Sequence, residues 1–258
     1  KYKKYISNYG QSYGEWAEPT EVHITGFKDF ACPHPEETTA YIVYMLQTMA
    51  EIAEVLGKTE DKKRFSEYAE KAKTGYGKLI ECPEFSLDTD RQAKLVRPLY
   101  MGLLDEKQTE FAKKRLITAL ERYDWRLGTG FLSTPFILYV LEDIDVEYAY
   151  RLLENEQMPG WLFMPKMNAN TIWESWEGTE AQGGIASLDH YSKGAVLEWV
   201  FSEMCGIKVS GENEFTIAPK AGGKFTFAKC EYQSVYGKVS CGWVRENGKT
   251  VYTISVPA

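Results

Sequence analysis

The sequence lacks the patterns that mark several large classes of protein. No apolar run approaches the roughly 20 residues that a membrane span needs, and the first ten residues are too polar for a signal peptide. No basic cluster is interleaved with aromatic residues, and the formal net charge is −7. We therefore expect neither nucleic acid nor a membrane surface as a partner. The compartment, cytoplasm or periplasm, stays open.

Cysteine is scarce and wrongly spaced for a metal site. The five cysteines include no Cys-x-x-Cys pair, so zinc ligation is not expected. Cys230 and Cys241 could face each other across two strands, but free buried thiols are the favoured interpretation. Neither a Gly-x-Ser-x-Gly elbow nor a phosphate-binding loop ending in Gly-Lys-Ser/Thr is present. The sequence thus supports neither serine hydrolysis nor a phosphate-binding loop, and we expect no metal.

Aromatic residues are abundant: 7 Trp, 17 Tyr and 12 Phe in 258 residues. Most of them serve core packing in a chain of this length. Tyr and Trp also combine an apolar face with a polar edge. That combination suits a pyranose ring, which has apolar C–H faces and a rim of hydroxyl groups.

The hydrophobic pattern is helical from about residue 35 to residue 206. In the first expected helix, which Pro35 begins and Gly57 ends, apolar residues recur at helical spacing. Thr59 is expected to cap the next helix. Further helices are expected around residues 90–104, 108–123, 135–141, 146–156 and 188–205. Because the linkers are short, neighbouring helices should be antiparallel.

The pattern changes to that of strands after Gly206. Residues 239–246 alternate with a period of two, and Asn247-Gly248 is a strong hairpin signal. We expect a helical segment over residues 1–207 and a small antiparallel β-domain over residues 208–258. So short a β-domain is only marginally stable alone, so it should pack on the helices.

The stretch "NANTIWESWEGTE", residues 168–180, interleaves tryptophan and glutamate. If residues 173–177 are helical, Trp173, Trp176 and Glu177 share one face and Glu174 lies beside Glu177. A carboxylate among tryptophans and flanked by loops is typical of sugar chemistry. A surface helix with buried tryptophans and solvated glutamates explains the same pattern.

Two further stretches carry candidate functional residues. In "SLDHYSKGAVLEWVF", His190 stands where a helix begins, and it can donate to a sugar hydroxyl or act as an acid or base. A backbone-bonded histidine at a helix start explains it equally well. In "LGTGFLSTPF", Gly128 and Gly130 permit an irregular turn and a close approach of the backbone.

Taken in order, these stretches resemble the bacterial α-L-rhamnosidases, a family of inverting glycoside hydrolases. "TIWESWEG" followed by "SLDHYSKGAVLEWVFSEMCGI" is similar to the family's Thr-x-Trp-Glu-x-Trp and Asn-His-Tyr motifs. "YGEWAEP" resembles its Gly-Asp-Trp turn, "LGTGFLSTPFIL" its Gly-Thr-Gly-Phe segment, and the tail its C-terminal β-domain. The resemblance runs from Tyr13 to Ala258.

The resemblance implies part of an (α/α)₆ toroid followed by a β-sandwich. It also implies cleavage of terminal α-L-rhamnosides with inversion and without a cofactor. Glu174 falls on the position of the catalytic base, His190 on a sugar-contacting histidine and Trp16 on the Trp of the Gly-Asp-Trp turn. We expect five residues to contact the substrate: His190, Trp16, Trp173, Trp176 and Glu177. The sequence departs from the family at Glu15, Ser133 and Asp189, where the family usually has Asp, Gly and Asn.

One expected part of the site is missing. The family's acid lies in an Asp/Arg/Glu-rich motif in the first half of the toroid, and no such motif occurs in this sequence. An inverting pair stands about 6.5–9.5 Å apart, whereas Glu174 and Glu177 on one helix would lie only about 5–6 Å apart at Cβ and on the same side of the sugar. We therefore expect Glu174 to be one member of a pair whose partner belongs to a missing N-terminal part of the same protein.

Two other hypotheses stay open at this point. The chain could be a non-catalytic module that binds glycans or serves as a scaffold, which the missing acid motif favours. It could also be a helical-toroid polysaccharide lyase that uses His190 and Tyr191 as base and acid. A lyase would release an unsaturated product that absorbs ultraviolet light, and a hydrolase would not.

Overall fold

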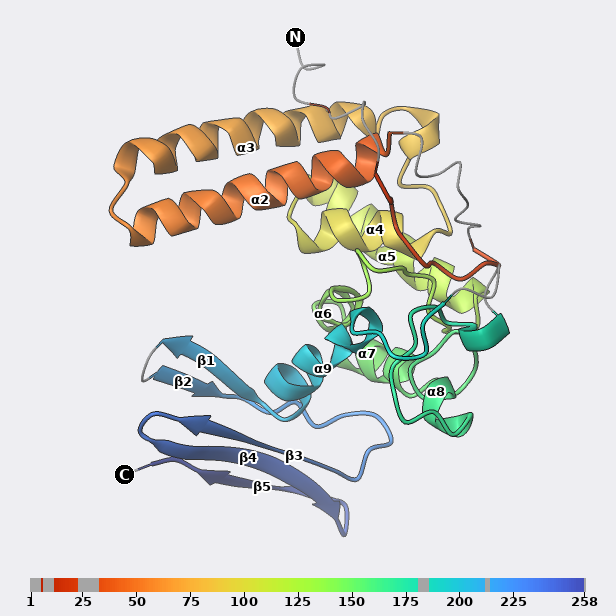
Figure 1. Ribbon diagram of the computed structural model, residues 1–258, viewed down its shortest axis with the longest axis vertical. Coiled ribbons are helices and arrows are strands. Elements are labelled where there is room, and N and C mark those ends of the chain that lie inside the picture. The colour runs from red at the N-terminus through yellow and green to blue at the C-terminus, as the bar shows by residue number, and fades with distance from the viewer. Residues whose placement is uncertain (1–5, 7–11, 23–32, 181–185, 212–213, 258) are drawn as a thin grey trace.

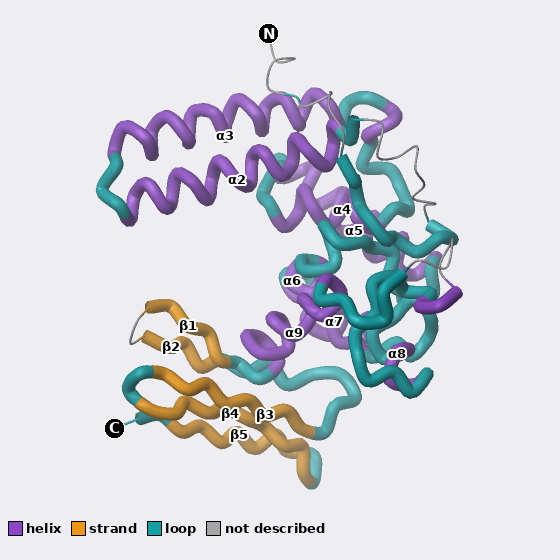
Figure 2. The backbone as a smooth tube through the Cα atoms, in the orientation of Figure 1, coloured by secondary structure: helices purple, strands orange, loops and turns teal. Residues whose placement is uncertain are grey.

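The computed structural model describes residues 6, 12–22, 33–180, 186–211 and 214–257. Among the described residues, the helices lie between Pro35 and Met204 and the strands between Ile207 and Ser255, so the two kinds of element occupy separate regions (Figures 1 and 2). The expectation of a mainly α fold with an antiparallel β tail is confirmed. The helices are α2 (Pro35–Val55), α3 (Thr59–Leu79), α4 (Gln92–Tyr100), α5 (Glu106–Arg122), α6 (Ile137–Glu142), α7 (Val146–Leu153), α8 (Phe163–Lys166) and α9 (Val196–Trp199).

The α2–α3 hairpin follows from local signals in the sequence. Pro35 occupies the first turn of α2, where its missing N–H costs nothing. Gly57, at φ +66°, reverses the chain between the two helices. The expected cap at Thr59 is wrong: Thr59 is the first helical residue, and the capping position is Lys58, whose side chain makes no capping hydrogen bond.

The helices form successive pairs, α2–α3, α4–α5 and α6–α7, with α9 after them. The first member of each pair contacts the first member of the next, so α2, α4, α6 and α9 form a continuous inner row. Their shared core includes Val43, Leu95, Ile137 and Trp199, all less than 2% exposed. This arrangement is part of an (α/α)₆ toroid.

The last helical stretch differs from the sequence-based expectation at its start. Residues 188–191 are not helical: a 3₁₀ turn begins at Ser192, α9 follows, and a π-helical turn ends at Met204. The reason is a hydrogen bond of the His190 backbone N–H to the Ile172 carbonyl, 2.8 Å away, outside the helix.

The strands form two antiparallel sheets. β1 (Ile207–Gly211) pairs with β2 (Glu214–Ile217), and β3 (Phe227–Ser234), β4 (Gly237–Glu246) and β5 (Lys249–Ser255) form the second sheet. Asn247 and Gly248 have φ values of +50° and +73° between β4 and β5, so the hairpin prediction is confirmed. Cys230 lies opposite Cys241 on the neighbouring strand, and both thiols are free.

One hydrogen bond from a strand and two ion pairs from the loop between β2 and β3 fasten the β region to the helices. The Trp243 indole N–H donates to the Met204 carbonyl over 2.8 Å. The Lys220 ammonium pairs with Glu203 at 2.9 Å and also with Glu142. Within the described ranges, no helix has the length and apolar character needed to cross a membrane.

Candidate active site

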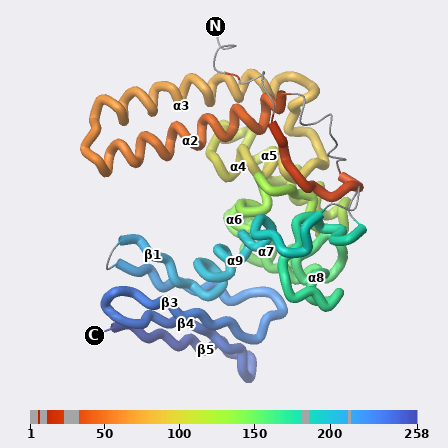
Figure 3. Tube along the Cα trace, in the orientation of Figure 1, coloured from red at the N-terminus to blue at the C-terminus, as the bar shows by residue number. Residues whose placement is uncertain are grey.

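Three segments that are distant in the sequence meet at the candidate site. In Figure 3 the red segment of residues 12–22 runs beside the green and cyan loops of the later helical region. The Phe131 N–H donates to the Trp16 carbonyl over 2.8 Å, and the Trp16 indole N–H donates to Glu174 Oε1 over 3.2 Å. The structure therefore brings together the turn, the glycine loop and the Trp-Glu motif that the sequence singled out.

The segment from Trp173 to Glu177 is not a helix, and the helical arrangement of its side chains is wrong. Its backbone runs through bends and a turn. The Glu174 N–H donates to the Ser187 carbonyl over 2.9 Å, so the segment pairs with the residues before His190 instead of with its own preceding turn. A spacing of three between similar residues fits such a turn as well as it fits a helix.

The Glu174 carboxylate is half-buried and held by two donors. Oε1 accepts the Trp16 indole N–H at 3.2 Å, and Oε2 accepts the Ser187 backbone N–H at 2.9 Å. Burial raises the pKa of this carboxyl, but these two hydrogen bonds and the positive potential of His190 and Lys193 outweigh it and lower the pKa below its ordinary value. Glu174 is therefore an oriented carboxylate that is ionised at neutral pH.

The Glu177 carboxylate holds a different part of the chain. Oε1 accepts the Thr20 backbone N–H at 2.8 Å and its hydroxyl at 3.1 Å. Oε2 accepts the Ser175 hydroxyl at 3.1 Å. Through these bonds Glu177 anchors the backbone at Thr20, which is not a contact that Glu174 makes.

The two tryptophans of the motif have different surroundings. Trp173 is half-buried, and its ring covers Gly178, where an added Cβ would approach the ring to 2.7 Å. Trp176 is only 1% exposed, donates from its indole to the Thr129 carbonyl over 2.8 Å and meets Trp161 edge to face. Because Trp176 is almost fully buried, its geometry does not support the expected substrate contact and fits a packing role behind the site.

His190 is oriented by its own neighbours. Its Nδ1 accepts the Ser192 backbone N–H at 3.2 Å, so in the neutral ring the proton resides on Nε2. The ring lies between two aromatic side chains, Phe131 at 5.0 Å and Tyr191 at 4.9 Å between centroids. Sequence reasoning missed Phe131, although its place between Gly130 and the Thr-Pro dipeptide was a signal that the loop carries it inward.

Two of the three residues that depart from the family motifs, Glu15 and Ser133, are hydrogen-bonded to each other. Glu15 Oε1 accepts the N–H groups of Gly130 and Ser133 at 2.9 and 2.8 Å, and Oε2 accepts the Ser133 hydroxyl at 2.8 Å. Gly130 is required because a Cβ there would lie 2.2 Å from the Trp16 carbonyl oxygen. The serine at 133 thus adds a donor for the glutamate at 15. Asp189 is exposed in the turn before His190.

A buried ionic cluster lies beneath the turn of residues 13–18, and the sequence did not reveal it. Arg97, which is 0% exposed, pairs with Glu15 and Glu36, and Arg91 binds Glu18 through two nitrogens at 2.5–3.0 Å. Burial raises the pKa of Glu18 to about 7, against the lowering effect of Arg91. These ion pairs fix the turn that carries Trp16.

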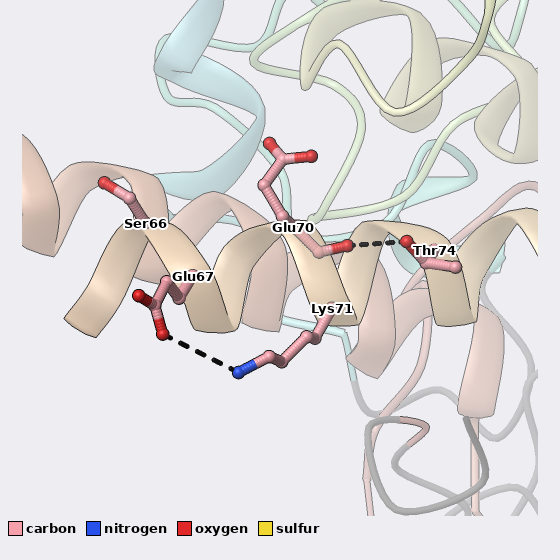
Figure 4. Close-up of a pocket in the computed structure, with 5 residues that line it drawn as sticks. All are labelled: Ser66, Glu67, Glu70, Lys71 and Thr74. Carbon is pink, nitrogen blue, oxygen red and sulfur yellow. Dashed lines mark hydrogen bonds and ion pairs between the residues drawn. The ribbon is translucent and has the colours of Figure 1, made fainter. Parts of the chain in front are cut away.

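A metal site or a second pocket would be an alternative candidate in the described part of the chain. Within those residues, no three His, Cys, Asp or Glu side chains are grouped so that they could hold a metal ion. A hollow of about 430 Å³ lies on the surface of α3, where Glu67 and Lys71 form an ion pair at 3.8 Å (Figure 4). All of its lining residues come from one helix, so it has no opposing wall.

Comparisons with known proteins define the class of the protein. Residues 2–204 match the model of the bacterial alpha-L-rhamnosidase 6 hairpin glycosidase domain. Residues 209–258 match that of the bacterial alpha-L-rhamnosidase C-terminal domain. The chain therefore belongs to the bacterial α-L-rhamnosidase family of six-hairpin glycosidases, and the resemblance seen in the sequence is confirmed.

Individual relatives agree with this assignment. The chain is 30% identical to an alpha-L-rhamnosidase of Streptomyces avermitilis over 95% of its own length and 24% of the relative's. The crystal structure of the Streptomyces avermitilis enzyme complexed with L-rhamnose superposes with a TM-score of 0.83 over 98% of this chain and 24% of that one, at 30% identity. The structure of the α-L-rhamnosidase from Dictyoglumus thermophilum superposes with a TM-score of 0.85 over 98% of this chain and 28% of that one, also at 30% identity. This chain thus spans about a quarter of the length of these relatives.

Proposed function

We propose that the chain supplies the general-base half of an inverting α-L-rhamnosidase site. Glu174 takes a proton from water as that water attacks the anomeric carbon of a terminal α-L-rhamnoside. The observation that carries this proposal is the Glu174 carboxylate itself, ionised and fixed between the Trp16 indole and the Ser187 N–H. General-base catalysis needs a group with this orientation and charge.

The neighbouring side chains have supporting roles in this proposal. His190 presents its Nε2–H to a sugar hydroxyl, since Nδ1 is occupied by Ser192. Trp16 holds the carboxylate, and the half-buried Trp173 and Phe131 offer apolar surface to the C–H face of the sugar. Glu177 keeps residues 19–22 in place and acts indirectly.

The proton donor for the leaving oxygen belongs to another part of the longer protein. The described residues contain three helix pairs, and the domain is named for six hairpins. Among the described residues, nothing covers one face of this inner row. On α2 and its C-cap, the following apolar residues are 38–87% exposed: Met45, Met49, Ile52, Val55 and Leu56. We propose that the remaining helix pairs of the same protein cover this face and carry the acid.

Turnover of a chromogenic α-L-rhamnoside tests the proposal. The longer protein is expected to release the chromophore, with the rhamnose product in the inverted configuration. The 258-residue chain alone is expected to show no turnover above background, since the proposed acid belongs to the remaining helix pairs. Robust turnover by the isolated chain would disprove the half-site. An unsaturated product from the longer protein would favour the lyase alternative.

A further inference from the structure

Lys193 contacts all three segments of the candidate site from a fully buried position. Its side chain is 0% exposed, and its Nζ donates to the Ala17 carbonyl over 3.0 Å and lies 3.5 Å from the Thr129 carbonyl. The same nitrogen lies 4.5 Å from the centroid of the Trp176 ring and 5.3 Å from that of Phe131. One side chain therefore links the turn, the glycine loop and the Trp-Glu motif.

Burying an amine in this way is costly. None of the described carboxylates forms an ion pair with Lys193, whose ammonium nitrogen contacts two carbonyl oxygens and two aromatic rings. Burial lowers the pKa of Lys193 to about 7, while the negative potential of the surrounding glutamates raises it. An apolar side chain of the same length would avoid this cost, so space filling alone does not explain a lysine here.

The contact with Ala17 connects Lys193 to the base. Ala17 has φ +54°, in the left-handed region that an alanine adopts only when its surroundings hold it there. The residue before it, Trp16, donates its indole N–H to Glu174. The Lys193 hydrogen bond thus fixes the backbone on which the indole depends.

We infer that Lys193 is a positioning residue for Glu174: it holds the Trp16–Ala17 turn so that the indole N–H stays on the carboxylate. This inference rests on the proposed role of Glu174 as the base. Lys193 does not touch the substrate, and it acts through Trp16.

The charged groups around both side chains determine what the loss of Lys193 changes. Glu174 receives the N–H groups of Trp16 and Ser187 and the positive potential of His190 and Lys193. Lys193 in turn lies in the negative potential of four carboxylates, those of Glu15, Glu18, Glu177 and Glu174. Without Lys193 the ionised form of Glu174 loses the Trp16 donor as well as a nearby positive charge, so its pKa rises.

A double-mutant cycle in the longer protein tests the inference. The variants are Lys193→Met, Trp16→Phe and the double variant, and the readout is the acid limb of the pH profile of kcat/KM, which reports the ionisation of the base in the free enzyme. Lys193→Met is expected to move this limb upward by about one pH unit, the scale of losing one charge-assisted hydrogen bond, and to lower kcat about tenfold. In the Trp16→Phe background the same substitution is expected to give a smaller shift, because only the loss of the positive charge remains.

An unchanged acid limb in Lys193→Met, or shifts that add fully in the double variant, would overturn the inference. Lys220→Met is the matched control. Lys220 forms ion pairs with two glutamates, and it lies where the strands join the helices. That variant is expected to unfold at a lower temperature and to keep the acid limb of the wild type.

A second variant covers the case in which Lys193→Met does not fold. A second measurement does not depend on the proposed function. If Lys193→Met does not fold, Lys193→Gln keeps the site polar with a shorter side chain and is expected to give the same upward shift. The pKa of the Glu174 carboxyl, followed by carbon-13 NMR in the longer protein with Glu174→Gln as the assignment control, needs no turnover. A rise in Lys193→Met supports the inference even for an enzyme inactive on rhamnosides, and an unchanged value refutes it.

Discussion

The candidate site and the α2–α3 hairpin differ in whether their side chains find partners within this chain. At the site, the polar groups find partners within the chain across long sequence distances: Trp16 bonds Glu174, and Thr20 bonds Glu177. On the hairpin, α2 buries one face against α3 and leaves Met45, Ile52 and Val55 on its other face 56%, 46% and 87% exposed. In Figure 1 this hairpin extends away from the helices that carry the site.

The difference separates two requirements of the same domain. Orientation of the Glu174 carboxylate needs only partners that are near it in the fold, and the chain contains them. Closure of a helical toroid needs a second layer across the inner row, and exposed apolar side chains mark where this layer is absent. The predictions below change one region and measure whether the other responds.

The largest effect is expected at Glu174, with stability unchanged. Glu174→Gln in the longer protein keeps the size of the side chain but removes the basic oxygen. We expect kcat to fall by about 10²–10⁴-fold, the usual contribution of a general base, with KM and the melting temperature little changed. Steady-state kinetics and thermal unfolding of the same preparation measure both quantities.

Glu177→Gln is the matched control for that variant. The amide oxygen can still accept from Thr20, and the amide NH₂ can donate to the Ser175 hydroxyl, so we expect a smaller loss of kcat and some loss of stability. Azide gives an independent check, because in the Glu174→Gln enzyme a small anion can attack without a base. The rhamnosyl azide should then have the inverted configuration. A retained product, or a Glu177→Gln enzyme that is the less active of the two, would contradict our assignment.

Elements with short-range signals were predictable from the sequence. Pro35 and Gly57 bound α2 because each acts on its own backbone, and Asn247-Gly248 form the β4–β5 turn for the same reason. Glu174 and His190 were found through motif resemblance, and the structure places them in neighbouring, hydrogen-bonded segments. Their catalytic and binding roles stay predictions.

Features that depend on tertiary contacts were not predictable. The spacing of Trp173 and Trp176 suggested a helix, but the backbone of this segment pairs with residues 187–190. Trp176 and Lys193 lie behind the site because both contact the loop after Leu127, more than 40 residues away in sequence. No periodicity within a single segment contains that information.

The second prediction concerns the exposed face of α2. Ile52→Glu is expected to leave the stability of the isolated chain within about 0.5 kcal/mol, since Ile52 is 46% exposed there. In the longer protein the same change is expected to cost about 2–3 kcal/mol, because the covering helices would bury an unpaired carboxylate. Urea unfolding of both proteins measures the difference. Tyr68→Glu on α3, an exposed site on the outer helix, should be neutral in both, and equal costs for Ile52→Glu in both would contradict the covering layer.

The smallest effect is expected within the hairpin itself, at Gly77 of α3. This glycine lies in the helix, and an added Cβ would meet no atom within 4 Å. Glycine costs a helix interior about 0.5–1 kcal/mol relative to alanine, mainly because its unfolded backbone has more freedom to lose. Gly77→Ala should therefore raise the free energy of unfolding by about that amount and leave kcat and KM unchanged. Gly130→Ala is the contrasting variant: its Cβ would meet the Trp16 carbonyl, so it should impair both stability and turnover. If Gly77→Ala instead lowered turnover, the hairpin and the site would be coupled, and the two regions could not be treated as independent.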